Sequence, residues 1–294
     1  MVATRSTGGP METAPELTAE PKDAQAVGIQ SGAYALELSL DWIVLRASEN
    51  IHRLLDESHV TLIDEPLGRF VHAQALHDLR NLFSRLSGTT GIGRAYGIRL
   101  TDEPELVDVA FQVSEGRVIL EAVPSAGAFG EFFGSVGGLV AGLAVSHGQA
   151  LFDNGARRMR ALTGYDRVTL ICDGKRAESS RGAFPASADF EADLPTILAD
   201  TEGTTVQLFP RNAEDTSVEA ALTRACGGQF LDQLRKDGVR ATLRIPFAVD
   251  GISGEFRCDS RTPREPCFEL HAAAELFAQL FAMRLQIDDL KKGD

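Results

Sequence analysis

The stretch RACGGQFLDQLRKDGVRATLRIPFAVDGISGEFRCDS, which spans Arg224–Ser260, contains the clearest structural signals in the sequence. Asp250-Gly251 stands between two runs rich in apolar and β-branched residues, and an Asp-Gly pair in that setting strongly favours a β-hairpin. The stretch therefore predicts a short helix around Phe230–Lys236, a tight turn at Asp237-Gly238, and antiparallel strands over Val239–Val249 and Gly254–Cys258.

Length and composition are those of an ordinary globular protein. The chain has 294 residues, of which 44% are hydrophobic and 24% charged, so it is long enough for two domains that each bury a core. A net charge of −13 argues against nucleic acid or an anionic membrane as the main partner. The longest near-apolar run, Val136–Val145, is too short to span a membrane, and the N-terminus has no signal-peptide pattern. We therefore expect a cytoplasmic protein with free thiols, since its four cysteines lack C-x-x-C spacing.

The first half of the chain changes from a polar arm to a mixed α/β pattern. Residues 1–27 contain several prolines and no apolar periodicity, which predicts a disordered arm. Ser48 is placed to cap a helix over Glu49–Leu55, because its hydroxyl can accept a hydrogen bond from a free backbone amide. The other elements expected are a helix over Ala73–Leu86 and strands over Tyr34–Leu38, Trp42–Arg46, Tyr96–Leu100, Val107–Gln112 and Val118–Val123.

The second half begins and ends with helices. Phe129–Leu162 is predicted to be a helical connector, rich in glycine in its first half, and Gly164 is placed to end it in a left-handed conformation. Phe268–Lys292 is predicted to be one amphipathic helix. This helix fits either pairing with a second copy of the chain or packing on its own sheet. Its apolar stripe consists of Leu270, Leu276, Phe277, Leu280, Phe281, Leu285 and Ile287.

Four segments, taken in order, resemble the PAS–GAF photosensory core of bacterial phytochromes over residues 20–288. The junction MRALTGYDRVTLI is the most specific of them. The segments are GIQSGAY at Gly28–Tyr34, VDVAFQVSEGRVILEAVP at Val107–Pro124, MRALTGYDRVTLI at Met159–Ile171, and LRKDGV at Leu234–Val239.

The resemblance implies an α+β fold. A PAS domain over residues 28–127 and a GAF domain over residues 149–294 would each be an antiparallel sheet flanked by helices, joined by a helical connector over residues 128–148. The GAF domain would include the long C-terminal helix. In the family the N-terminal arm passes through a lasso segment to form a knot. Only Arg211–Arg224 remains for that lasso here, so the sequence does not decide whether this chain forms the knot.

The pocket residues depart from the family pattern. Phytochromes hold a linear tetrapyrrole in the GAF pocket, attached to a cysteine in the arm or in the GAF domain. No cysteine precedes Cys172 here, and the arm position falls near Leu17–Thr18, which offers no nucleophilic sulfur for a thioether. The family's pocket histidine falls at Phe230 and its second histidine near Asp259-Ser260. None of the six histidines lies within residues 148–270.

The resemblance nevertheless assigns residues to a degenerate bilin pocket. Arg224 keeps the place of a family arginine, and Asp193 lies in a displaced half of the family's PASDIP motif. Cys226 lies three residues from the GAF attachment position, where Gln229 stands. The candidate cofactor-binding residues are Arg224, Asp193, Cys226, Phe230, Cys258 and Asp259.

The sequence offers no catalytic or metal-binding constellation. Without a histidine within residues 148–270, a Ser-His-Asp triad is not credible there, and the cysteine spacing matches no iron–sulfur pattern. We therefore expect a non-enzymatic sensory module without a bilin, which acts through a protein partner or as a homodimer of its GAF helices. Two alternatives stay open: a photoreceptor that holds biliverdin non-covalently or through Cys226, and a small-ligand or thiol-redox sensor that uses the GAF pocket. The signal, the output partner and any longer sensor kinase stay open as well.

Overall fold

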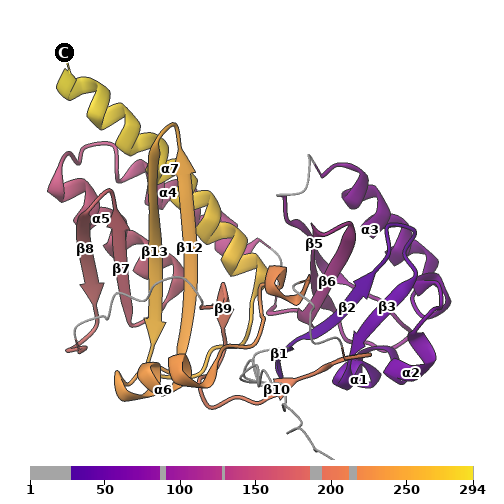
Figure 1. The fold of residues 1–294 in the computed structure, drawn as a ribbon. Helices are drawn as coiled ribbons and strands as arrows, with labels where there is room; N and C mark the ends of the chain where they lie inside the picture. Colours follow the sequence, from indigo (N-terminus) through magenta and orange to yellow (C-terminus); the bar gives the residue numbers. More distant parts are fainter. Residues whose placement is uncertain (1–27, 87–90, 128–129, 186–193, 212–216, 294) are drawn as a thin grey trace, which may run out of the picture.

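The computed structural model describes residues 28–86, 91–127, 130–185, 194–211 and 217–293. Within these residues the chain forms two large antiparallel sheets with flanking helices and one small two-stranded sheet (Figure 1). The first large sheet is built mainly from the first half of the chain, the N-terminal domain, and the second from the rest, the C-terminal domain. This is the α+β architecture that the sequence predicts.

The N-terminal domain is a six-stranded sheet in the order β11-β3-β2-β6-β5-β4. Its core packs the Trp42 ring edge-on against Phe83 and Phe111, at centroid distances of 5.9 and 6.5 Å. The strands are β2 (Tyr34–Leu38), β3 (Val44–Ser48), β4 (Gly93–Ile98), β5 (Val107–Ser114), β6 (Arg117–Pro124) and β11 (Leu208–Phe209). The helices are η1 (Glu49–Ile51), α1 (His52–Leu55), α2 (His59–Leu62), η2 (Leu67–Arg69) and α3 (Ala73–Ser84).

Three local predictions in this domain are wrong in detail. The strand predicted over Tyr96–Leu100 is β4, which begins three positions earlier, at Gly93, and ends at Ile98. The predicted strand over Trp42–Arg46 begins two positions later, because Trp42 has a positive φ of 67° and belongs to the preceding turn. Ser48 does not cap the following helix with its side chain. Its Oγ instead accepts a hydrogen bond from the Ala35 amide at 3.1 Å, on the neighbouring strand. The hydroxyl that the local sequence predicts as a helix cap is therefore used in a hydrogen bond between two strands.

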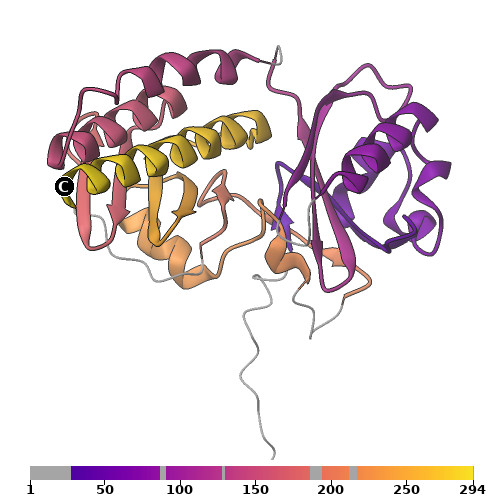
Figure 2. The same cartoon turned by 90° about the horizontal axis from the view of Figure 1, so that it is seen from above.

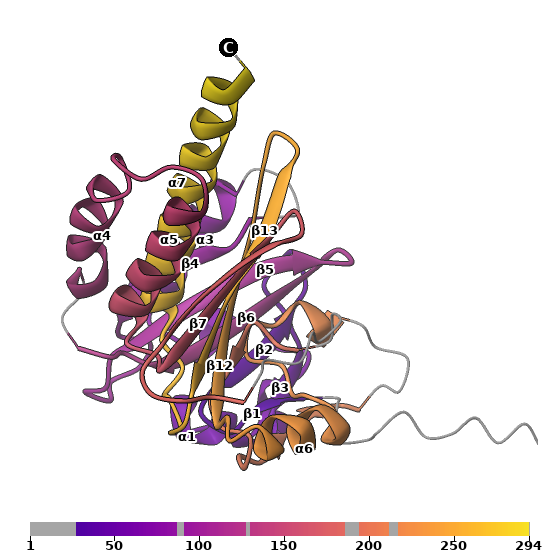
Figure 3. The same ribbon diagram turned by 90° about the vertical axis from the view of Figure 1, so that its left-hand side faces the viewer.

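The C-terminal domain is a five-stranded sheet in the order β8-β7-β13-β12-β9, with helices on both faces (Figure 3). Helices α5 and α7 pack on one face, beside α4, and α6 lies on the other. The strands are β7 (Arg167–Cys172), β8 (Lys175–Ser180), β9 (Ile197–Leu198), β12 (Ala241–Val249) and β13 (Ile252–Ser260). The helices are α4 (Glu131–Ala141), α5 (Gln149–Thr163), α6 (Gly228–Lys236) and α7 (Phe268–Gly293).

The predicted hairpin and helix end are confirmed. Val249 pairs with Ile252 across a two-residue turn, in which Asp250 and Gly251 have φ values of 43° and 86°. Two positive φ values are what the tight hairpin turn of an Asp-Gly pair requires. Helix α5 ends at Gly164, whose φ of 68° is left-handed as expected.

Two strands of the second half of the chain pair with strands of the first half (Figure 2). Strand β11 comes from the second half of the chain but extends the N-terminal sheet by pairing with β3. Strands β1 (Ile29–Gln30) and β10 (Thr205–Val206) pair, while Ile29 also forms a bridge with Arg224. Ile29, near the start of the described chain, therefore lies between β10 and Arg224. The predicted arm, and with it the open question of a knot, falls on residues 1–27, outside the described residues, and the domain boundaries stay a prediction.

A buried carboxylate holds the same junction together. Glu121 on β6 is 1% exposed, and burial raises its pKa. Its two oxygens accept hydrogen bonds from the amides of Leu222 and Thr223 and from the Thr223 hydroxyl, at 2.7, 2.8 and 2.6 Å. Leu222 and Thr223 lie between η3 (Ser217–Ala220) and α6, in the second half of the chain. They supply the hydrogen bonds that the buried Glu121 carboxylate of the first half needs.

We predict that Gly155→Ala lowers the free energy of unfolding by about 1–3 kcal/mol, because an added methyl group overpacks a filled core. A Cβ at Gly155 on α5 would overlap the ring of Phe281 on α7, which is fully buried. Urea denaturation of the purified variant measures this change. Gly134→Ala on α4 is the matched control, since a Cβ there meets no described atom within 4 Å. Equal stability of both variants would contradict the close packing of α5 and α7.

Candidate ligand site on the C-terminal sheet

One face of the C-terminal sheet is polar although much of it is buried. Side chains alternate along a strand, so residues between those that pack on α5 and α7 point to the opposite face. The apolar face, which packs on these helices, includes Val168, Leu170, Leu243, Phe256 and Cys258. The polar face, on the side of α6, includes Arg167, Thr169, Thr242, Arg244, Arg257 and Asp259, which lie in register on neighbouring strands.

The centre of the polar face is a buried ion pair between Arg167 and Asp259. Their side chains are 2% and 0% exposed, and Arg167 Nε and Nη2 donate to Asp259 Oδ2 at 2.8 and 2.6 Å. Arg167 also donates to the Pro185 carbonyl at 2.7 Å. The Phe184 ring centroid lies 4.6 Å from the Arg167 guanidinium, with the Arg261 guanidinium 3.8 Å from the same ring. Hydrogen bonds and stacking together offset the cost of removing these charges from water.

Three polar atoms around this pair lack a hydrogen bond within the described residues, although Asp259 Oδ1 lies 3.7 Å from Arg257 Nε. Thr169 Oγ1, Thr242 Oγ1 and Asp259 Oδ1 are buried and form no hydrogen bond with the described part of the chain. Buried polar atoms are nearly always satisfied, so such a group marks a place for ordered water or a polar ligand. The nearby Arg257 guanidinium is 8% exposed, and burial lowers its pKa.

An apolar cluster lies beside the polar groups, between α6 and the sheet. Phe184 joins the two parts, because it belongs to the cluster and also stacks on Arg167. Cys226 is 4% exposed within this cluster. The cluster comprises Phe184, Leu194, Leu198, Cys226, Phe230, Leu231, Leu234 and Val239. These side chains fill space next to the ion pair.

The structure brings together three of the six predicted site residues. Cys226, Phe230 and Asp259 lie on the α6 side of the sheet. Cys258 lies on the opposite face, in the core with α5 and α7. Arg224 lies at the junction of the domains, where its carbonyl accepts a hydrogen bond from the Gln30 side chain at 3.2 Å. Asp193 lies outside the described residues.

Sequence reasoning missed Arg167 and the two threonines as members of the site. Arg167 and Thr169 alternate with the apolar Val168 and Leu170 in YDRVTLI, which is the signal of a strand with two different faces. The alternation along one strand does not predict that Arg167 pairs with Asp259, because the two residues are 92 positions apart.

Three of the four thiols, those of Cys172, Cys258 and Cys267, have a raised pKa. Burial raises the pKa of Cys172 to about 11, and it raises the pKa of Cys258 and Cys267 as well. Thiolate, the reactive form, is therefore scarce at neutral pH. Among the described residues, no group of three or more His, Cys, Asp or Glu side chains could hold a metal ion. No helix in the described ranges is long and apolar enough to cross a membrane.

Solved structures with the same fold are chromophore-binding domains of bacterial phytochromes. The chain superposes on the chromophore-binding domain of an unusual bacteriophytochrome, RpBphP3 from R. palustris, with a TM-score of 0.70 and 20% identity over 92% of this chain and 99% of that one. The chromophore-binding domain of Stigmatella aurantiaca phytochrome P1 gives 0.68 and 22%, over 90% and 98%. The photosensory core module from Stigmatella aurantiaca gives 0.71 and 21%, with 93% of this chain covering 60% of that module.

No protein-family model and no curated protein sequence matches the chain. The resemblance expected from the sequence is confirmed at the level of the fold: the chain has the PAS–GAF fold of a bacteriophytochrome chromophore-binding domain. In this fold the N-terminal domain is the PAS domain and the C-terminal domain is the GAF domain. Identities of 20% to 22% establish the fold and leave the ligand to be inferred from the site.

We predict that Asp259→Ala lowers the free energy of unfolding by about 3–5 kcal/mol, because it leaves the buried Arg167 charge without its partner. Chemical denaturation measures the loss. Asp232→Ala is the control, since Asp232 pairs with Arg235 where their side chains are 65% and 38% exposed. An exposed pair contributes about 1 kcal/mol or less. If both variants lost the same stability, the ion pair would not be the centre of this face.

Proposed function

We propose that the chain is a phytochrome-like PAS–GAF sensory module that has lost covalent bilin binding and relays a signal through protein interaction, without catalysis. The cytoplasmic location expected from the sequence is part of this proposal. The observation that carries it is the Arg167–Asp259 ion pair, because the resemblance places the family's second pocket histidine near Asp259. A histidine there would support a pyrrole by hydrogen bonding, whereas this carboxylate is engaged by an arginine of its own chain.

The residues present do not fit a covalently attached bilin. No cysteine precedes Cys172, and Cys226 is buried in the apolar cluster beside α6. The propionates of a bilin need cationic partners, but Arg240 and Arg244 beside this face pair with acids of the protein. Arg240 donates to Asp200, and Arg244 donates to Glu255 at 3.0 and 2.6 Å. Phe230, at the position of the first pocket histidine, offers only packing.

We expect that biliverdin incubated with the protein forms no red-absorbing, photoconvertible adduct that survives denaturation. Absorption spectra before and after illumination, followed by denaturing electrophoresis, measure this. A bacteriophytochrome chromophore-binding domain treated in parallel is the positive control. A stable adduct would contradict the proposal. If Cys226→Ser then abolished the adduct, the chain would be a photoreceptor that attaches its pigment through Cys226.

Relay between the domains is supported by polar contacts onto α7. Arg94 on β4 donates to Glu275 at 2.6 Å and lies 2.8 Å from His271 Nδ1, and both partners are on α7. Burial lowers the pKa of His271 to about 3, so its ring is neutral and accepts the Arg94 hydrogen bond. A displacement of the N-terminal sheet would therefore act directly on the helix that ends the described chain.

A homodimer through α7 belongs to the same proposal. The predicted apolar stripe divides into two sets: Phe277, Phe281 and Leu285 are buried against the sheet, while other large apolar residues face outward. The outward set is Leu276, Met283, Ile287 and Leu290, which are 43%, 48%, 47% and 68% exposed. Their spacing alternates as in a coiled-coil seam, which favours pairing with a second α7.

We predict that the protein is a dimer at micromolar concentration and that Met283→Glu/Ile287→Glu converts it to a monomer, because two charges would be buried in the seam. Sedimentation velocity measures the mass. Leu40→Glu/Val60→Glu is the control, since these residues are 53% and 71% exposed on the N-terminal domain and the double variant carries the same added charge. A wild-type monomer, or a control variant that dissociates equally, would contradict the α7 interface.

A small-ligand sensor is the second candidate function. The three unsatisfied atoms Thr169 Oγ1, Thr242 Oγ1 and Asp259 Oδ1 favour it, because together they offer two hydroxyl groups and an acceptor in a buried setting. Soaking crystals in a mixture of small polar compounds tests this candidate. Ligand density at these three atoms would support it, and ordered water alone would oppose it.

A further inference from the structure

A second concave surface lies on the N-terminal domain, away from the polar face of the C-terminal sheet. Two adjoining hollows of about 270 and 410 Å³ lie between α1 and the segment from Leu100 to Val107 that joins β4 to β5. Asp56, Leu100, Thr101 and Glu103 line both hollows, so they form one groove.

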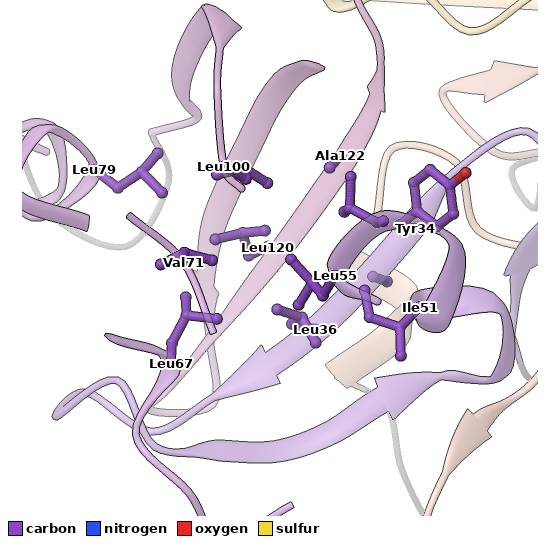
Figure 4. A pocket seen from close by; sticks show the side chains of 12 residues that line it. Tyr34, Leu36, Ile51, Leu55, Leu67, Val71, Leu79, Leu100, Leu120 and Ala122 are labelled. Carbon is purple, nitrogen blue, oxygen red and sulfur yellow. The ribbon is translucent and has the colours of Figure 1, made fainter. Parts of the chain in front are cut away.

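The floor of this groove is apolar and continues into an apolar pocket in the domain core (Figure 4). Leu100 lines both hollows and the pocket, Leu54 lines the first hollow and the pocket, and Leu55 and Val71 line the second hollow and the pocket. Figure 4 shows Leu55, Val71 and Leu100 among the side chains around the pocket, with Leu120 nearby. The pocket is narrow, so the groove offers one apolar socket in its floor.

The rim of the groove is strongly acidic. Five exposed carboxylates line it, from the end of α1 and from the segment between β4 and β5: Asp56, Glu57, Asp102, Glu103 and Glu105. Among the basic residues on the rim, Arg69 pairs with Glu65 at 2.6 Å, outside the groove. The other basic residues on the rim are Arg53, His52 and His72, and His72 Nε2 lies 3.4 Å from Asp102 Oδ1. Five carboxylates outnumber the two arginines, so negative charge prevails.

We propose that this groove docks a basic peptide segment of a partner protein, with one apolar side chain of that segment seated over Leu54 and Leu100. Acidic rims steer basic partners, and a buried apolar anchor holds them. Residues 1–27 of the chain do not match, since Arg5 and Lys22 are outnumbered by four acidic residues: Glu12, Glu16, Glu20 and Asp23. A second copy, with its net charge of −13, would be repelled.

The test uses a fluorescein-labelled peptide of lysines and glycines around one central phenylalanine, followed by fluorescence anisotropy. We expect Asp102→Lys/Glu103→Lys to weaken binding roughly tenfold or more, because these exposed carboxylates face the groove. Asp41→Lys/Glu178→Lys is the matched control, with the same change in net charge at exposed sites away from the groove, and it should bind within about twofold of wild type. Replacing the phenylalanine of the peptide with serine should weaken binding to wild type by roughly tenfold.

Four results would overturn the proposal. They are no binding by the wild-type protein, equal losses in the two double variants, equal binding of the phenylalanine and serine peptides, and displacement of the peptide by spermine as efficient as by the unlabelled peptide. The last would assign the groove to small polycations. If Asp102→Lys/Glu103→Lys instead abolished self-association, a second copy would be the occupant. None of these outcomes depends on whether the C-terminal domain binds a bilin.

Discussion

The buried ion pair between Arg167 and Asp259 is the constraint on which the polar face of the C-terminal domain depends. Each charge costs several kcal/mol to remove from water, and the cost is offset only because the two groups meet in good geometry and Arg167 has further partners. The pair joins β7 to β13 and holds Phe184 under the guanidinium. This polar face is thereby partly filled by the protein's own charged groups.

The second organising feature is the exchange of segments between the domains. Strand β11 completes the N-terminal sheet, and Glu121 satisfies backbone amides of the second half of the chain. Arg94 then connects that sheet to α7. These contacts form a continuous path from one domain to the outward apolar residues of the final helix, which is the physical requirement for relay. The proposed relay would use this path.

Much of the fold could be predicted from the sequence, because its strongest signals are local. The Asp250-Gly251 turn, helix α3 and the end of α5 at Gly164 each follow from a few neighbouring residues. Ser48 could not be predicted, because its hydroxyl is used by another strand. The pairing of β11 with β3 and of Arg167 with Asp259 joins distant segments, and such pairs leave no periodic pattern in a single sequence.

The candidate site could likewise be predicted only in part. The resemblance to the family predicts Cys226, Phe230 and Asp259 as site residues, and these three lie on one side of the sheet. The resemblance also predicts Cys258 as a site residue. Side chains alternate along β13, so Cys258 instead faces α5 and α7. The sequence predicts an apolar stripe along Phe268–Lys292. It does not predict which of these residues face the sheet and which face outward, because that depends on how α7 packs on β12 and β13.

The most direct measurement is a crystal structure of the protein purified from cells that make biliverdin. The account predicts Arg167 and Asp259 in hydrogen-bond contact, with side chains and water filling the space between α6 and the sheet. Continuous tetrapyrrole density in that space, with the ion pair opened to receive it, would contradict the account.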